Sequence, residues 1–265
     1  MKIAVTGKGG VGKTTFAGIL ARLFGRSGFR VIAVDADPNI NLAYTLGLPP
    51  SEVAKIKPLA VNRELLRERM EVYPGSLEQG FFKLYPKVDD IIDIYGIKCP
   101  DNVTLLVMGT VRDGGTGCLC PAHALMRALL RYLILKRNEI VILDMEAGIE
   151  HLARGTARKV DLMITVVEPN MKAIDTAERI RKLAYDIEVR NVVAVGNKIS
   201  SKEEEEFVRR NLDLINLELL GIIPYDNKVK LSDMNRSSVL DLYPNSIAIK
   251  AIEEIKNKLI NYIQN

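Results

Sequence analysis

The chain has 265 residues, of which 48% are hydrophobic and 26% are charged. This composition is typical of a globular protein and excludes a disordered, collagen-like or coiled-coil chain. The net charge of +4 is too small to indicate a nucleic-acid partner. No apolar run approaches the roughly 20 residues that a membrane-spanning helix needs. The chain does not open on the pattern of a secretory signal, and its three cysteines cannot pair off. We therefore expect a cytoplasmic protein that binds neither nucleic acid nor membrane.

Short apolar segments alternate along the chain with longer amphipathic ones. The apolar segments, expected to be strands, lie near residues 2–6, 30–34, 103–108, 139–144, 160–167, 190–196 and 219–223. The amphipathic segments, expected to be helices, lie near residues 13–27, 121–137, 171–187, 201–214 and 246–263. Because the strands are apolar on both faces, helices should cover both sides of the sheet. The pattern predicts one α/β domain over residues 1–265, with a doubly wound, mostly parallel sheet flanked by helices and an irregular insertion around 48–100.

A glycine-rich loop follows the first predicted strand and fits two motifs. It reads Gly7-Lys8-Gly9-Gly10-Val11-Gly12-Lys13-Thr14-Thr15. The spacing G-x-G-x-x-G is that of a dinucleotide site, with Asp35 near the place of a ribose-binding acid. The spacing G-x-x-x-x-G-K-T is that of a phosphate-binding loop (P-loop), where the lysine contacts phosphates and the threonine binds Mg²⁺. A dinucleotide site needs neither Lys13 nor Thr14, so the P-loop is favoured. We expect the main chain of 9–15 to hold ATP at a helix N-terminus.

Acidic residues follow two other predicted strands. Asp35 and Asp37 come after the second strand, and Asp144 ends the apolar strand 139–144. The carboxyl ends of parallel strands meet at one edge of the sheet, where ligands bind. Asp144 can hold Mg²⁺ through its water, and Gly148 permits a switch loop after it. Together with the P-loop, these acids predict ATP hydrolysis.

Lys8 narrows the class of ATPase. The segment from Lys8 to Thr14 resembles K-G-G-x-x-K-[ST], the deviant P-loop of the superfamily of MinD, ParA and the nitrogenase iron protein, which are P-loop NTPases of the SIMIBI type. The resemblance implies a homodimer that encloses two ATP molecules face to face. It also implies that Lys8 reaches the partner's nucleotide, while Lys13 holds the phosphates within its own chain.

The same resemblance assigns roles to the other residues at this edge. It implies that Thr14 binds Mg²⁺, that Asp37 orients the attacking water and that Asp144 is the Mg²⁺-associated acid. Asn197-Lys198, at the end of the sixth predicted strand, matches the superfamily's adenine contact. A second cation at the γ-phosphate offsets charge that builds up in the transition state.

Two cysteines lie one residue apart before the predicted helix 121–137. In an extended segment, Cys118 and Cys120 face the same way, so both sulfurs can approach one metal. The helix that begins near Pro121 would lower their pKa and favour the thiolate. Tetrahedral thiolate sites need four ligands, and a symmetric dimer supplies two from each chain. His123 is a possible further ligand, although a role on the helix face or in capping is favoured.

A closer family resemblance comes from the segment after the fourth predicted strand. Residues 144–151 read D-x-E-A-G-x-E-H, the switch motif of the CooC-type ATPases, which mature the nickel site of carbon monoxide dehydrogenases and acetyl-CoA synthases. Residues 154–156 and 166–170 are also similar to that family, as is the Cys-x-Cys. The resemblance implies one metal, Ni²⁺ or Zn²⁺, bound between two subunits by paired Cys-x-Cys motifs. It implies an ATP-hydrolysing metallochaperone with a nickel enzyme as client.

Two alternatives use the same ATPase scaffold. One is a positioning ATPase of the MinD or ParA type, which the mild charge and the Cys-x-Cys disfavour. The other is a metal-storage or metal-sensing protein with a structural nucleotide, which Lys8 and Asp37 disfavour. The residues leave open which metal and client are used and what His151 does, and Cys99 is interpreted as a plain thiol.

Overall fold

The computed structural model describes residues 1–37, 40–70, 86–109, 121–137, 139–145 and 160–264. Its strands are β1 (Lys2–Gly7), β2 (Val31–Asp35), β3 (Ile97–Cys99), β4 (Val103–Val107), β5 (Ile140–Asp144), β6 (Leu162–Val167), β7 (Val192–Ile199) and β8 (Glu218–Pro224). Its helices are α1 (Lys13–Arg26), α2 (Leu42–Thr45), α3 (Pro50–Val53), the 3₁₀ helix η1 (Leu59–Val61), α4 (Arg63–Met70), α6 (Ile91–Tyr95), α7 (Pro121–Lys136), α9 (Met171–Asp186), α10 (Lys202–Leu214), α11 (Asn227–Met234), α12 (Val239–Leu242) and α13 (Ile247–Gln264). Every strand and helix expected from the sequence is present, with its ends shifted by three residues at most.

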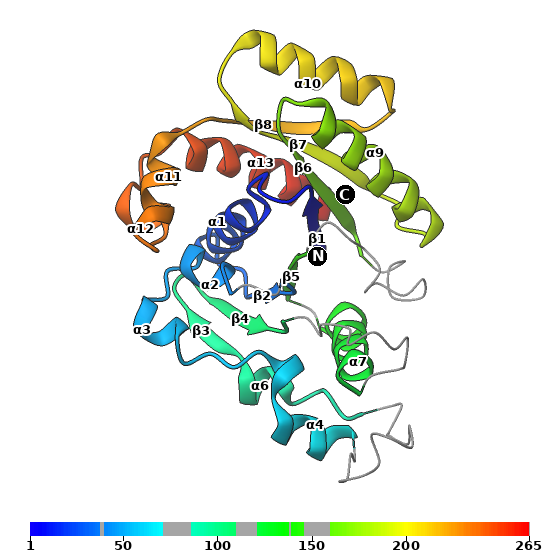
Figure 1. The fold of residues 1–265 in the computed structure, drawn as a ribbon, viewed down its shortest axis with the longest axis vertical. Helices are drawn as coiled ribbons and strands as arrows, with labels where there is room; N and C mark the ends of the chain where they lie inside the picture. Colours follow the sequence, from blue (N-terminus) through cyan, green and yellow to red (C-terminus); the bar gives the residue numbers. More distant parts are fainter. Residues whose placement is uncertain (38–39, 71–85, 110–120, 138, 146–159, 265) are drawn as a thin grey trace.

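The strands form a single sheet with the order β3-β4-β2-β5-β1-β6-β7-β8 (Figure 1). All neighbouring strands are parallel except β3 and β4. The expected doubly wound, mostly parallel sheet is therefore confirmed. Strand β3 was not expected, because three residues with intermediate or exposed side chains carry no apolar pattern.

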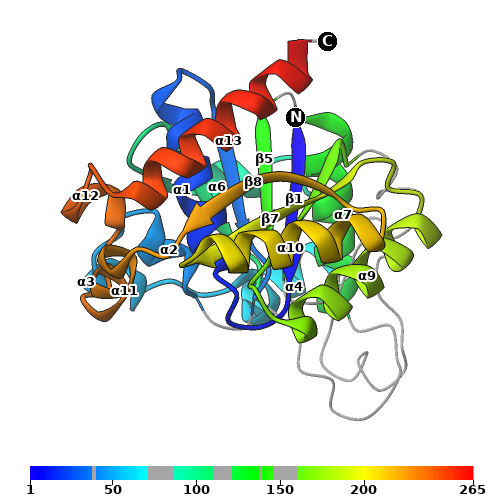
Figure 2. The same cartoon turned by 90° about the horizontal axis from the view of Figure 1, so that it is seen from above.

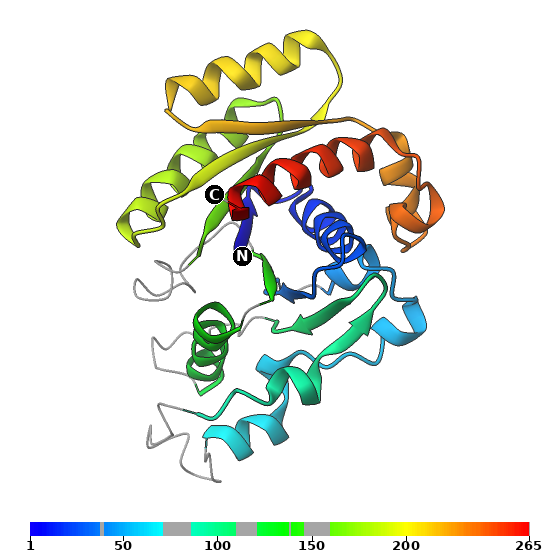
Figure 3. The same ribbon diagram turned by 180° about the vertical axis from the view of Figure 1, so that it is seen from behind.

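Helices cover both faces of this sheet. Helices α1 and α13 pack on one face, and α4, α7, α9 and α10 lie on the other (Figures 1 and 3). Alternate strand residues divide between the two layers: Ile3 and Val5 belong to the core under α1, whereas Ala4 belongs to the core under α7. The amphipathic C-terminal segment packs its apolar side into the core as expected, since Ile252 and Leu259 are buried. Among the described helices, none is long and apolar enough to cross a membrane.

The segment 48–100, expected to be irregular, contributes short elements. Its described part holds α3, η1, α4, α6 and β3. Pro50 is the first residue of α3, where a missing N–H costs nothing. Whether this segment is an insertion stays a prediction.

The carboxyl ends of the parallel strands lie together at one edge of the sheet. In Figure 2 this edge is at the bottom, and the loop that joins β1 to α1 runs along it. Helix α1 therefore points its N-terminus at the edge where acids follow β2 and β5. This arrangement brings the P-loop, the acids after β2 and β5, and Asn197 into one region.

Candidate active site

The P-loop connects β1 to α1 by a path that only glycine can follow at two positions. Gly7 (φ 141°) ends β1, and a Cβ there would lie 2.5 Å from the carbonyl oxygen of Val166 on β6. Gly12 (φ 93°) is left-handed, and a Cβ there would lie 2.4 Å from the Asn197 amide nitrogen. Positive φ and close contact both exclude larger residues. The glycine pattern therefore reflects the approach of the loop to β6 and β7.

The two lysines of the loop lie in different surroundings. Lys13 is the first residue of α1, its side chain is buried, and its Nζ donates a 3.2 Å hydrogen bond to the carbonyl of Lys8. The Lys13 ammonium thus lies against the inner side of the loop. Lys8 itself has intermediate exposure. The position of Lys13 suits contact with phosphates in the same chain.

Two buried carboxylates lie side by side at the edge of the sheet. Asp35 and Asp144 are register partners on β2 and β5, with exposures of 0% and 1%. Burial raises the pKa of Asp144 to about 6. Burial, and then the neighbouring Asp144 charge, raise the pKa of Asp35 well above its usual range. Two buried carboxylates that are both ionised repel each other, so this place favours a cation between them or beside them.

The surroundings of Asp144 fit a hydrated Mg²⁺. Neither carboxylate oxygen accepts a hydrogen bond of normal geometry from a described residue. The Thr14 hydroxyl is close enough to lower the pKa of Asp144, and so is the Lys13 ammonium. Buried polar atoms without partners are rare in folded proteins. Mg²⁺ keeps several of its waters when it binds, and those waters would supply the missing donors. Thr14 and Asp144 would hold this ion with the nucleotide.

Asp35 shapes the loop that carries Asp37. Its carboxylate accepts hydrogen bonds from the backbone N–H groups of Asp37 (3.1 Å) and Leu42 (3.3 Å). Asp35 is therefore turned toward its own loop and is inaccessible to a ribose, which agrees with a P-loop rather than a dinucleotide site. This positioning role was not predicted, because strand spacing does not show which of two acids is buried.

A polar cavity of about 900 Å³ lies in front of the P-loop. Lys13, Thr14 and Asp37 line it together with glycines of the loop. Its opposite wall comes from α2, α3, α11 and α12, including Tyr44 and Arg236. The structure thus brings the Lys13 ammonium, the Thr14 hydroxyl and the Asp37 carboxylate around one space. That space can hold a triphosphate and its metal ion.

A second, mostly apolar cavity of about 330 Å³ adjoins the first and shares Gly10, Gly12 and Thr15 with it. Asn197 and Lys198 line it, as does the turn after β8 at Pro224–Asp226. A mostly apolar cavity with a few polar groups suits a base. The roles of Asn197 and Lys198 toward adenine stay predictions. The sequence reasoning missed the wall from β8 and α11, although the end of a predicted strand near 223 could have indicated it.

The two residues predicted to contact adenine also contact the P-loop. The Asn197 amide donates to the carbonyl of Val11 at 2.7 Å. The Lys198 ammonium donates to the carbonyl of Gly10 at 2.8 Å and forms a 2.6 Å ion pair with Glu168. These contacts tie β7 to the loop.

The predicted thiolate ligands, Cys118 and Cys120, lie outside the described residues. So do His151, whose role the sequence left open, and the side chain of His123, whose backbone lies in the first turn of α7. The described part of the chain holds no group of three or more His, Cys, Asp or Glu side chains arranged for a metal ion. Cys99 lies on the edge strand β3, and burial raises the pKa of its thiol to about 12. It is a protonated thiol at neutral pH, as the sequence suggested.

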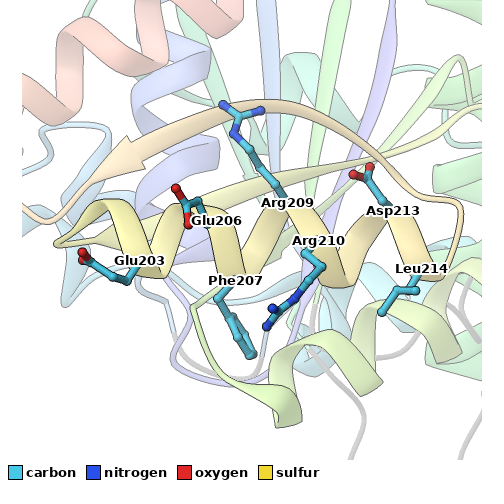
Figure 4. Close-up of a pocket in the computed structure, with 7 residues that line it drawn as sticks. All are labelled: Glu203, Glu206, Phe207, Arg209, Arg210, Asp213 and Leu214. Atoms are coloured by element: carbon cyan, nitrogen blue, oxygen red, sulfur yellow. The ribbon is translucent and has the colours of Figure 1, made fainter.

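A hollow also lies along α10, away from the P-loop (Figure 4). Its lining residues are Glu203, Glu206, Phe207, Arg209, Arg210, Asp213 and Leu214. All belong to this one helix, and among them acidic side chains lie on either side of two adjacent arginines. The surface has the charge pattern of a solvated helix face.

Comparisons with known proteins show that the chain belongs to a family of nucleotide-binding domains. Residues 2–239 match the model of the CobQ/CobB/MinD/ParA nucleotide-binding domain. The chain is 47% identical over 263 residues to an uncharacterized ATP-binding protein of Methanocaldococcus jannaschii, covering 99% of this chain and 97% of that protein. It is 44% identical over 248 residues to the carbon monoxide dehydrogenase accessory protein CooC of Rhodospirillum rubrum, covering 92% and 91%.

Solved structures show the same fold at lower identity. MinD of Aquifex aeolicus, in its complex with MinC, is 21% identical, with a TM-score of 0.69. The match covers 98% of this chain and 95% of the MinD chain. MinD of Pyrococcus horikoshii OT3, solved with Mg-ADP, is 19% identical with a TM-score of 0.66, and the coverages are 97% and 94%.

Proposed function

Because the chain belongs to the family of CobQ/CobB/MinD/ParA nucleotide-binding domains and is a CooC-type member of it, we propose that it is an ATP-dependent metallochaperone for a carbon monoxide dehydrogenase or acetyl-CoA synthase. The observation that carries this proposal is the 44% identity to CooC over 92% of the chain. The ATPase activity is common to the family. The proposal adds the cargo, which is nickel, and the client, which is a nickel enzyme.

ATP and Mg²⁺ supply an electrophilic γ-phosphate when they are bound. Lys13 neutralises phosphate charge from inside the loop, where it is 8% exposed and lines the polar cavity. Thr14 and Asp144 would hold the Mg²⁺, and Asp37, which lines the same cavity, would orient the attacking water. Each of these four side chains belongs to the sheet edge or the loop in front of it.

Lys8 serves the nucleotide of a partner subunit in this proposal. Lys13 lines the polar cavity but Lys8 does not. A lysine at the rim of the loop suits a contact that forms only when two copies meet. Hydrolysis would then depend on formation of a homodimer, which gives the ATPase its timing.

Cys118 and Cys120 bind the cargo. Two thiolates from each of two chains make four ligands for one metal. Thiolate sites accept nickel and zinc alike, so we propose Ni²⁺ as cargo and Zn²⁺ as a competitor. Closure of the dimer by ATP would change the spacing of the four sulfurs and so release the metal to the client.

Metal analysis combined with sedimentation tests this function. The protein is loaded with Ni²⁺ or Zn²⁺, with and without a non-hydrolysable ATP analogue, and the metal content and mass are measured. We expect one metal per two chains, lost in Cys118→Ser and Cys120→Ser. Cys99→Ser is the matched control and should keep the metal, because its thiol is protonated at neutral pH. One metal per monomer, or full binding by the Cys118→Ser variant, would contradict a bridging site.

A second experiment separates ATP-driven assembly from metal binding. Lys8→Ala should still bind ATP but should not dimerise with it or hydrolyse it. Lys13→Ala should lose ATP binding itself, because its ammonium lies within its own loop. Dimerisation and turnover are measured by light scattering and phosphate release. Wild-type hydrolysis by Lys8→Ala would refute the intersubunit role.

A further inference from the structure

Lys198 occupies an unusual backbone position next to the P-loop. It has a φ of 59°, a left-handed conformation that is costly for a residue with a side chain. It lies where the pairing of β7 with β8 shifts register, between Gly196 and Ile199. Irregularities of this kind re-aim side chains near active sites. The irregularity directs the Lys198 ammonium toward β6 and the loop after β1.

The ammonium makes two short contacts with elements far apart in the sequence. It donates to the carbonyl of Gly10 at 2.8 Å and pairs with the Glu168 carboxylate at 2.6 Å. Glu168 directly follows β6, and its carboxylate also accepts a 3.4 Å hydrogen bond from the amide of Asn170, the N-cap of α9. The pair therefore joins the end of β6, the end of β7 and the P-loop.

We propose that Glu168 and Lys198 are positioning residues of the ATPase, which hold the P-loop in the shape that binds phosphate. The inference concerns nucleotide binding alone and does not depend on the metal cargo or the client.

The physical reason lies in the planarity of the peptide group. In a trans peptide the carbonyl and the following N–H point in opposite directions. Lys198 holds the carbonyl of Gly10, and Asn197 holds that of Val11 at 2.7 Å. The N–H groups of Val11 and Gly12 then point away from β7. The Val11 N–H donates to the carbonyl of Lys8 at 3.5 Å, the same carbonyl that accepts from the Lys13 ammonium on the inner side of the loop. Inward N–H groups are what a P-loop uses to bind an anion.

Glu168 is needed because it fixes the lysine. The side chains of Lys198 and Glu168 are 43% and 23% exposed, so water screens their attraction and the ion pair alone adds little stability. The ion pair instead fixes the position of the Lys198 ammonium, so that it can hold the carbonyl of Gly10. The effect should appear in nucleotide affinity rather than in the stability of the fold.

The experiment compares Lys198→Met and Glu168→Gln with a control pair elsewhere on the surface. Lys182 and Glu178 form an ion pair of 2.7 Å on α9, with exposures of 62% and 37%, so Lys182→Met removes the same chemistry away from the loop. Dissociation constants for Mg-ADP and Mg-GDP are measured by calorimetry, and unfolding is followed by circular dichroism.

We expect Lys198→Met to weaken Mg-ADP binding by about tenfold, the loss of one charge-assisted hydrogen bond partly screened by water. Mg-GDP should weaken by the same factor, because the P-loop does not read the base. Lys198→Arg should restore binding, since arginine can donate to both acceptors. In the Lys198→Met background, Glu168→Gln should have no further effect. Lys182→Met should bind as the wild type does.

Three results would overturn the proposal. Unchanged affinity in Lys198→Met is the first. The second is a loss for Mg-ADP only, which would make Lys198 a contact of the base. The third is a lower melting temperature of Lys198→Met at unchanged affinity for Mg-ADP, which would make the ion pair merely structural. If Lys198→Met does not fold, Glu168→Gln and Lys198→Arg decide the question by the same affinities.

Discussion

Replacing Asp144 with asparagine should stabilise the protein while it abolishes hydrolysis. Burial raises the pKa of this carboxyl from 3.8 to about 6, so the native state holds the proton more tightly than the unfolded chain. The contribution of this carboxyl to stability is therefore fully present below about pH 4 and is lost as the pH rises from about 4 to about 6. A shift of about two pH units, at about 1.36 kcal/mol per unit, corresponds to about 3 kcal/mol lost by pH 7.

The Asp144→Asn variant keeps the shape of the side chain and cannot ionise. At pH 8, in EDTA and without nucleotide, its free energy of unfolding should exceed that of the wild type by roughly 1–3 kcal/mol. The gain is reduced toward about 1 kcal/mol because a buried amide at this position would find few partners among the described residues, as the carboxylate does. The melting temperature should rise by about 2–10 °C. The neighbouring Asp35 adds to the gain, because the charge of Asp144 raises its pKa.

Urea unfolding from pH 4 to pH 8 measures the difference between the variant and the wild type. The difference should be smallest near pH 4 and reach its full size above pH 6. The matched control is Asp213→Asn on the exposed side of α10, which should change neither stability nor hydrolysis. A variant that is less stable than the wild type at pH 8, or a difference that does not vary with pH, would refute the reasoning. Phosphate release in Mg²⁺ should be lost in Asp144→Asn.

Three further predictions follow from other contacts. Gly12→Ala should weaken nucleotide binding, measured by calorimetry, and destabilise the fold by about 1–3 kcal/mol. The reason is that the φ of Gly12 is 93° and a Cβ there would lie 2.4 Å from the Asn197 amide. Wild-type affinity would argue against this loop geometry. Asp37→Ala should retain ATP binding but release phosphate at least tenfold more slowly, roughly the effect of losing a positioned catalytic group; an unchanged rate would remove Asp37 from the mechanism. Arg22→Met should lower the free energy of unfolding, measured in urea, by about 2–3 kcal/mol. The reason is that Arg22 is 2% exposed and pairs with Asp101 and Asp241 at 2.7 Å. An unchanged free energy of unfolding would mean that the two carboxylates do not need this partner.

Spacing along the chain was enough to predict the long helices, the strands other than β3, and the P-loop, but not the short helices. Strands that are apolar on both faces require helices on both sides, and the doubly wound sheet follows. Gly12, Lys13 and Thr14 predict a P-loop because their order matches the chemistry of a bound phosphate. These inferences depend on residues close in sequence, so neighbouring positions carry the information. The short strand β3 was missed because three residues at an edge have no such pattern.

Contacts between distant segments were decided only by the tertiary structure. Asp35 and Asp144 look alike in the sequence, but the pairing of β2 with β5 buries both. Hydrogen bonds turn Asp35 toward its own loop, whereas the Asp144 carboxylate accepts none of normal geometry from the described residues and lies near Thr14 and Lys13. Lys198 was predicted from its motif as a base contact, and the register shift in β7 also aims it at Gly10. Strand order and register set which side chains meet, and they depend on how the whole sheet packs. The sequence therefore determined which groups carry the chemistry, and the fold decided which of them face the nucleotide and which hold the others in place.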